Sequence, residues 1–385
     1  MTNHYFPVDK FKSLDTPFYY YDMDVLSRTL STASSEASKY GYHVHYAVKA
    51  NANDRVLDII KNAGFGADCV SGNEVRKAIE RGFNPSKVVF AGVGKADWEI
   101  NYGLDANILC FNVESIPELR IIDELANVKG KTAKVALRIN PNVNANTHHY
   151  ITTGLNENKF GINLWDLEKV VDVVMSLKNV QLIGIHFHIG SQITDMESFK
   201  GLCLRVNELQ EWFVQRKVLL KVINVGGGLG IDYHHPNQHA VPDFATYFSV
   251  FKQFLKLRDG QEVHFELGRS LVGQCGSLIT RVLYVKEGVN TKFAIVDAGM
   301  NDLIRPALYQ AYHKIENIES VGEPDKYDVV GPVCESSDCF GKAVQLPKTE
   351  RGHLIAIRTA GAYGEIMASR YNLREFAKAV FSDTI

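Results

Sequence analysis

The chain has 385 residues, 45% of them hydrophobic and 22% charged, which is long enough for about two domains with ordinary cores. Its 42 basic and 44 acidic side chains nearly cancel, so neither nucleic acid nor an anionic membrane is indicated as a partner. The six cysteines have no paired spacing, the N-terminus has no leader-like segment, and no apolar run approaches the ~18 residues of a membrane span. We therefore predict a cytoplasmic protein with reduced thiols and a small-molecule partner.

From residue 43 onward, short β-branched or apolar runs alternate with segments of helical period, which is typical of βα units around a parallel sheet. The spacing Ser71–Glu74 is that of a capping box and predicts a helix directly after the second run. Eight such runs predict a (β/α)8 barrel of the TIM type. They are residues 43–50, 66–72, 88–92, 108–115, 134–140, 182–191, 222–228 and 262–270.

After residue 270 the pattern changes to strand-like runs such as LITRVLYVKEG and KFAIVDAG, with no amphipathic helix of comparable length between them. These runs predict a second, mostly β domain of barrel or sandwich type. We assign residues 30–270 to the α/β barrel, and residues 1–29 together with 271–385 to the β domain.

In a barrel of this kind, chemistry takes place at the C-terminal ends of the strands. The unusual polar residues of the sequence gather at that rim, at or just beyond the ends of their predicted strands. They are Lys49, Asp68, His188, Gly226–Gly228, Glu266 and Arg269.

Several of these residues have both a structural and a chemical interpretation. Lys49 among apolar neighbours could extend into solvent, or its pKa could be lowered so that the neutral amine forms a Schiff base with an aldehyde. The run Gly226–Gly228 could be a tight turn or a backbone cradle for phosphate. Glu266 could form an ion pair with Arg269, or it could keep a pyridine nitrogen protonated.

His186 and His188 lie two apart on one predicted strand and share a face. Such a pair could bind zinc in a metal-dependent hydrolase, but no further ligand cluster is evident, and we predict no metal. An imidazole could instead lie flat against an aromatic ring. A Schiff-base lysine, a phosphate cradle, a stacking imidazole and a pyridinium partner together indicate pyridoxal phosphate.

Six motifs in order along nearly the whole chain resemble those of the barrel-type (fold-type III) pyridoxal-phosphate decarboxylases. They are YAVKAN, HFHIGSQI, NVGGGLG, ELGRS, CESSD and GAYG. Two positions differ from the family pattern: Leu267 replaces a proline and Ser337 a glycine, which changes backbone stiffness more than chemistry. The segment 148–162 resembles the branch of the family that acts on a diamino dicarboxylic acid.

The resemblance implies a role for each matching residue. Lys49 would form the Schiff base, His188 would stack on the ring, Glu266 would hold the pyridine nitrogen protonated, and Cys334 would donate a proton to the carbanion. The phosphate would be bound by Gly226, Gly227 and Gly228 with Ser191 and Tyr363, and Gly268 and Arg269 would also contact the cofactor. The substrate would contact Arg269, Arg305, Tyr309, Glu335 and Tyr363. The loop with Cys334 and Glu335 would reach into the site of a second copy, so the resemblance implies a homodimer with shared active sites.

Within this class, Glu266 favours decarboxylation, because the related alanine racemase places an arginine at the pyridine nitrogen. Glu335 and the arginines at 269 and 305 favour an amino acid with both a distal amine and a distal carboxylate. Decarboxylases of carboxynorspermidine, ornithine or arginine remain enzymatic alternatives. A pyridoxal-phosphate-binding homeostasis protein is the non-enzymatic alternative, although such proteins lack a second domain.

Overall fold

The computed structural model describes residues 5–142 and 159–385. Their contacts divide the chain into two compact units. One unit comprises Leu30–Gly230 and Asp243–Gly268, and the other comprises Met1–Thr29, Ile231–Pro242 and Arg269–Ile385. The sequence had not set the short segment Ile231–Pro242 apart. Residues 148–158 of the segment that resembles one branch of the family lie outside the described residues.

The first unit contains a closed barrel of eight strands in the order of the chain, β2 to β9, and every neighbouring pair is parallel. The predicted barrel is therefore confirmed. Its strands are β2 (His43–Ala47), β3 (Gly66–Cys69), β4 (Val88–Phe90), β5 (Cys110–Val113), β6 (Ala133–Arg138), β7 (Val180–His186), β8 (Val222–Asn224) and β9 (Glu262–Leu267).

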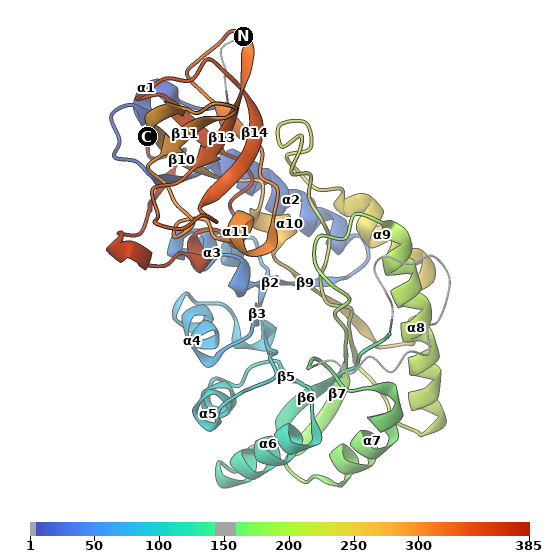
Figure 1. Ribbon diagram of the computed structural model, residues 1–385. Helices are drawn as coiled ribbons and strands as arrows, with labels where there is room; N and C mark the ends of the chain where they lie inside the picture. The colour runs from blue at the N-terminus through green and yellow to red at the C-terminus, as the bar shows by residue number, and fades with distance from the viewer. Residues whose placement is uncertain (1–4, 143–158) are drawn as a thin grey trace. The chain divides into compact units, whose positions relative to one another are not determined.

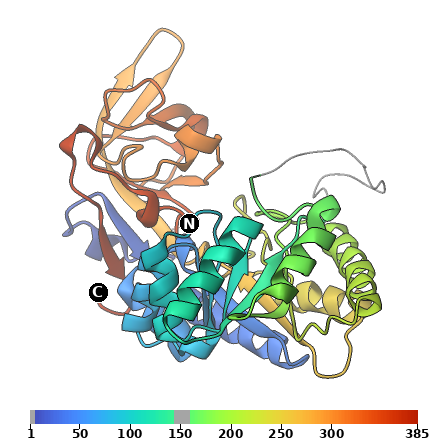
Figure 2. The same ribbon diagram turned by 90° about the horizontal axis from the view of Figure 1, so that it is seen from below.

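Helices surround this ring of strands on its outer side (Figures 1 and 2). They are α2 (Met23–Ser38), α3 (Asp54–Asn62), α4 (Gly72–Glu80), α5 (Asp97–Ala106), α6 (Ile116–Val128), α7 (Leu167–Ser176), α8 (Met196–Gln215) and α9 (Phe244–Phe254). Side chains that accept a backbone N–H cap several of them; Ser71, for example, accepts the N–H of Glu74 at the start of α4 and so confirms the predicted helix start.

Alternation along β9 decides which side chains enter the barrel. Phe265 packs outward on the rings of Tyr247, Phe248 and Phe251, with centroid distances of 4.9–5.7 Å. Glu266 and His264, the neighbours of Phe265 in sequence, therefore face the interior, Glu266 near the C-terminal rim and His264 near the N-terminal rim. The barrel thus carries buried polar groups at both ends of its axis.

The second unit is built on a sheet in the order β12-β15-β10-β11-β13-β14, and β1 pairs with β10 and β16. This confirms the expected mostly β domain and the place of the N-terminal segment in it. The strands are β1 (Phe18–Tyr21), β10 (Gly276–Glu287), β11 (Lys292–Val296), β12 (Ile315–Asn317), β13 (Pro324–Val330), β14 (Cys339–Pro347), β15 (Leu354–Ile357) and β16 (Lys378–Phe381). Three short helices complete it: α1 (Val8–Phe11), α10 (Arg269–Val272) and α11 (Arg305–Tyr309).

In the described part of the chain, no helix is both long enough and apolar enough to cross a membrane.

Candidate active site

Glu266 is the centre of a buried polar group at the C-terminal rim of the barrel. Its Oε1 accepts hydrogen bonds from the side-chain amides of Asn224, at 2.7 Å, and Asn112, at 3.0 Å. Its Oε2 lies 2.9 Å from Nε2 of His186. Three strands besides β9 therefore supply a partner to this one carboxylate.

The protonation of His186 follows from its surroundings. Burial lowers the pKa of His186 to about 3, so the ring is neutral, and its Nδ1 is buried without a hydrogen-bond partner. Nε2 therefore carries the proton and donates it to Glu266. Burial raises the pKa of Glu266, while the positive charge of Lys49 and the hydrogen bond from Asn224 oppose that effect. With three N–H donors directed at it, we assign Glu266 as a carboxylate.

Lys49 lies in a single 3-10 turn, Val48–Ala50, directly after β2. The residues on either side of Lys49 are buried. We expected apolar surroundings from the sequence, but the groups around the Lys49 side chain are polar. Its charge acts on the carboxyl group of Asp68, whose pKa burial raises to about 7, and on Glu266. It also acts on His188, whose pKa is lowered to about 3 chiefly by burial and then by Lys49. Lys49 is thus placed among carboxyl groups and a neutral imidazole.

Gly268 allows the end of β9 to approach the turn that carries Lys49. A Cβ added at Gly268 would lie 3.1 Å from the Cβ atoms of both Ala47 and Ala50. Leu267, where the family has a proline, is the buried last residue of β9.

The glycine loop after β8 has no room for side chains. A Cβ on Gly226 would lie 2.2 Å from the carbonyl oxygen of Phe187, and one on Gly227 would lie 1.9 Å from that of Glu266. The N–H of Gly226 donates to Asn224 Oδ1 at 2.9 Å, whereas the amides of Gly227 and Gly228 bond to no group in the described residues. The amides of Gly227 and Gly228 are therefore open to an anion, whereas the amide of Gly226 already has a partner. Ser191 is exposed in the loop after β7.

These residues fit pyridoxal phosphate. Asp68 Oδ1 and His186 Nδ1 are buried polar atoms without partners, and such atoms are uncommon unless a bound group or water completes them. The amides of Gly227 and Gly228 offer donors to an anion, and Lys49 supplies the only kind of side chain that joins an aldehyde as an amine.

The roles of Asn112 and Asn224 were not predicted. Each is one amide in an otherwise apolar strand, in CFNV and VIN. A buried amide needs partners, so its isolation in such a run was the available signal, although nothing in the sequence indicated Glu266 as the partner.

The second unit carries its own cationic cluster. The guanidinium of Arg269 donates to the hydroxyl of Tyr233 and lies 4.9 Å from the ring centroid of Tyr363. The guanidinium of Arg305 lies 5.8 Å from the same ring and 5.8 Å from that of Tyr309. Tyr363 is held at φ +57°, in the left-handed region that side chains other than glycine seldom adopt. Two arginines thus share one tyrosine held in an unusual backbone conformation.

Arg305 differs from the buried Arg358 of this unit in having no carboxylate partner. Arg358 Nη1 lies 2.7 Å from Glu316 Oε2, whereas Arg305 forms no ion pair within the described residues. The Nε of Arg305 is also buried without a hydrogen-bond partner, as is that of Arg358. Burial lowers the pKa of Arg305, and the charge of Arg269 lowers it further. A buried guanidinium in this situation is completed by an anion.

Cys334 and Glu335 are exposed in a loop before β14. The buried carboxylate of Asp338 shapes that loop, because it accepts the N–H of Val333 at 2.7 Å and that of Met300 at 2.7 Å. Glu335 accepts a hydrogen bond from the hydroxyl of Tyr371. The last residue of CESSD therefore holds the loop, while Cys334 and Glu335 face outward from this copy of the chain and Ser337 is exposed.

Residues 24–273 match the family model of the pyridoxal binding domain of pyridoxal-dependent decarboxylases. The chain is 64% identical to a diaminopimelate decarboxylase from Bacteroides thetaiotaomicron over 99% of both chains. It is 42% identical to one from Helicobacter pylori strain J99, covering 94% of this chain and 89% of that one. A crystal structure of the Helicobacter pylori enzyme complexed with L-lysine matches with a TM-score of 0.89 at 39% identity, over 97% of this chain and 93% of that one. A lysine/ornithine decarboxylase from Vibrio vulnificus, at 20% identity and a TM-score of 0.84, shares the fold.

The chain therefore belongs to the pyridoxal-dependent decarboxylase family and is a carboxy-lyase that uses pyridoxal phosphate. Within that family, the relatives described above that are at least 39% identical to this chain are diaminopimelate decarboxylases.

Proposed function

We propose that this protein removes CO2 from meso-2,6-diaminopimelate to give L-lysine, the last step of lysine biosynthesis. The observation that carries the choice of substrate is Arg305, a buried guanidinium without a carboxylate partner in the described chain, close to the second guanidinium of Arg269. A substrate with a distal carboxylate completes such a pair by charge-assisted hydrogen bonds. The names of the similar proteins agree with this substrate.

When bound, pyridoxal phosphate supplies an aldehyde that joins an amine and a ring that accepts the electron pair left by departing CO2. Lys49 offers the amine that holds the aldehyde before substrate arrives. Glu266, kept ionised by three N–H donors, holds a proton on the ring nitrogen. His188 presents a neutral ring for stacking. The amides of Gly227 and Gly228, with Ser191, bind the phosphate.

The proton that replaces CO2 comes from the thiol of Cys334, and Glu335 binds the distal ammonium. Both side chains are exposed in a single copy, although proton transfer and ammonium binding both favour a site sheltered from water. We infer that they complete the site of a second copy, so that the active unit is a cytoplasmic homodimer.

Two alternatives make different demands on these residues. Ornithine and arginine have no distal carboxylate, so their decarboxylation gives Arg305 no role. Carboxynorspermidine remains the enzymatic alternative nearest in chemistry. A protein that only stores the cofactor would need neither the arginine cluster nor the loop that Asp338 shapes.

The test is CO2 release by the purified holoenzyme with meso-diaminopimelate, carboxynorspermidine, ornithine and arginine in parallel. We expect diaminopimelate to have the highest kcat/KM. A higher value for any of the other three amino acids would overturn the proposed substrate.

Arg305→Met is expected to lower kcat/KM for diaminopimelate by about 10- to 100-fold, because a hydrogen bond to a charged group contributes about 1.5–3 kcal/mol. Most of the loss should appear in KM, since the contact is remote from the bond that breaks. Arg351→Met is the matched control: Arg351 is exposed and stacks on Tyr284, and its loss should leave both constants unchanged. Equal kinetics for the parent and Arg305→Met would remove Arg305 from substrate binding.

A mixture of two inactive variants tests the shared site. Lys49→Ala and Cys334→Ala chains, dissociated and reassembled together, should regain about a quarter of the parent activity, because random pairing makes half of the dimers mixed and each mixed dimer has one intact site. Each variant reassembled alone is the control. If the mixture stays inactive while capture through an affinity tag on one variant shows that mixed dimers have formed, Cys334 acts within its own chain.

A further inference from the structure

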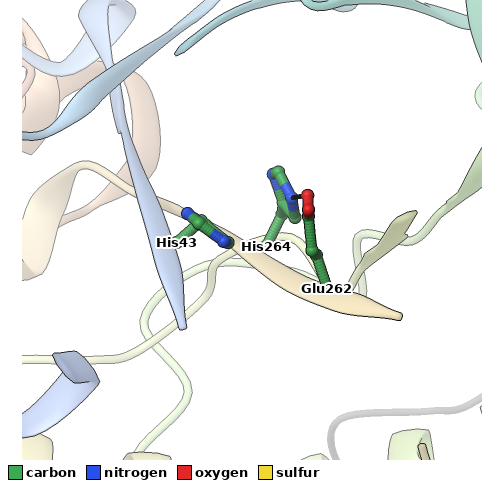
Figure 3. Close-up of side chains that lie close together, drawn as sticks. All are labelled: His43, Glu262 and His264. Carbon is green, nitrogen blue, oxygen red and sulfur yellow. Dashed lines mark hydrogen bonds and ion pairs between the residues drawn. The ribbon is translucent and has the colours of Figure 1, made fainter. Parts of the chain in front are cut away.

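A second group of polar side chains lies at the opposite, N-terminal rim of the barrel, where β2 and β9 close the ring. His43 on β2 pairs in register with His264 on β9, and Glu262 lies two residues before His264 on the same face (Figure 3). One ligand atom from each of the three lies within 4.8 Å of the others. No other set of three or more His, Cys, Asp and Glu residues in the described chain meets this geometry.

A line of three polar contacts runs from Glu262 through His264 and His45 to the backbone carbonyl of Lys87. Nδ1 of His45 lies 2.9 Å from the carbonyl oxygen of Lys87, Nε2 of His45 lies 2.8 Å from Nδ1 of His264, and Nε2 of His264 lies 3.4 Å from Oε2 of Glu262. The line has an acceptor at each end and three contacts, but two neutral imidazoles supply only two N–H protons. One contact therefore lacks a proton.

The lengths of the three contacts show where the two protons lie. The contacts at 2.9 and 2.8 Å have ordinary hydrogen-bond lengths, so we assign one proton to Nδ1 of His45, which donates to the carbonyl of Lys87, and the other to Nδ1 of His264, which donates to Nε2 of His45. The 3.4 Å contact is the longest of the three, which leaves a lone pair on Nε2 of His264 facing the carboxylate of Glu262. His45 and His264 are 2% and 3% exposed, and a charged ring at such depth is costly.

We propose that His43, Glu262 and His264 form a binding site for one divalent transition metal ion of the zinc class, which connects the first and last strands of the barrel. Two imidazoles and one carboxylate are a ligand set that zinc accepts, with a water in the fourth position. Zinc–ligand bonds of about 2.0–2.2 Å in a tetrahedral site place neighbouring ligand atoms about 3.4 Å apart. Nε2 of His264 and Oε2 of Glu262 are already 3.4 Å apart.

The outer contacts of the site have the form that metal ligands require. The hydrogen bond from His264 Nδ1 to His45 fixes the ring that presents its other nitrogen to the metal, as is usual for ligating histidines. Gly66 makes room for the hydrogen bond between His45 and Lys87, because a Cβ at residue 66 would lie 2.2 Å from the carbonyl oxygen of Lys87 and 2.4 Å from Nδ1 of His45. Lys221 contacts Oε1 of Glu262 at 3.3 Å and leaves Oε2 to the metal.

An ion can reach the site from solvent. A pocket of about 400 Å³ opens on it, with His43, His45, Gly66, Lys87, Glu262 and His264 among its lining residues. His43 is exposed, so its ring can turn toward the other two ligands without disturbing the core.

The test is calorimetric titration of zinc into holoenzyme that has been treated with a chelator and dialysed. We expect one site per chain, and a higher temperature of thermal unfolding with zinc than with chelator. His43→Gln and Glu262→Gln should each weaken zinc binding by about 100-fold or more, since loss of an outer partner alone costs about 10–100-fold. Both should keep their decarboxylase activity and their unfolding temperature in chelator.

His239→Gln is the matched control. His239 lies 2.7 Å from Asp232 in the other unit, so it is a surface imidazole–carboxylate pair outside the proposed site, and its loss should leave zinc affinity unchanged. Cobalt in place of zinc should give the visible bands of a tetrahedral site in the parent and not in His43→Gln. The proposal is wrong if the parent binds no zinc, or if His43→Gln and Glu262→Gln bind zinc as tightly as the parent does. An extra proton would then occupy the contact between His264 and Glu262.

Discussion

Replacing Lys49 with alanine is expected to abolish the visible absorption of the bound cofactor and to lower turnover by about 10⁴-fold or more, the loss seen when a covalent group of a catalytic unit is removed. The physical reason is that the amine of Lys49 is the group that joins the aldehyde, and the methyl group of alanine cannot form that bond. Absorption spectra and CO2 release measure the two effects separately.

Lys178→Ala, an exposed lysine of the same unit, is the control and should match the parent in both assays. Thermal unfolding of the Lys49 variant shows whether the protein remains folded, since Lys49 also lies near the carboxyl groups of Asp68 and Glu266. A folded Lys49→Ala protein that keeps its colour and turnover would place the reactive amine elsewhere.

Replacing Glu266 with glutamine is expected to lower kcat by about 10²–10³-fold, as loss of one preorganised electrostatic partner does in other enzymes. The amide has nearly the shape of the carboxylate but no charge to hold a proton on the ring nitrogen. The effect should fall on kcat rather than KM, because the charge matters most as electrons enter the ring.

The same change also affects stability. Three N–H groups now donate to Glu266, and the amide group of glutamine would turn its own donors toward at least one of them, at a cost of about 1–3 kcal/mol. Glu266→Asp keeps the charge and should recover part of kcat. If Glu266→Gln and Glu266→Asp lose kcat equally, packing rather than charge would explain the role of residue 266.

The barrel could be predicted because its signal is local and repeated. Each strand is a short apolar run, and helix starts such as Ser71 follow directly. The position of Lys49, His188 and Glu266 at one rim then follows from topology alone. The closed ring β2–β9 confirms that prediction of the fold.

What could not be predicted depends on contacts between distant residues. Asn112 lies 154 residues before Glu266 in the chain, and their 3.0 Å hydrogen bond leaves no trace in local pattern. The predicted apolar environment of Lys49 was wrong for the same reason. Its neighbours in sequence are apolar, but its neighbours in space include the carboxyl groups of Asp68 and Glu266. Likewise, Gly226 donates to Asn224, which only the folded loop shows.

The most direct measurement reduces the holoenzyme with borohydride, digests it and locates the pyridoxyl group by mass spectrometry. We predict that the modified peptide carries the group on Lys49, and that the mark is absent from a digest of the Lys49→Ala protein treated in the same way. A pyridoxyl group on any other lysine, with Lys49 unmodified, would contradict the proposed place of the cofactor at the mouth of the barrel.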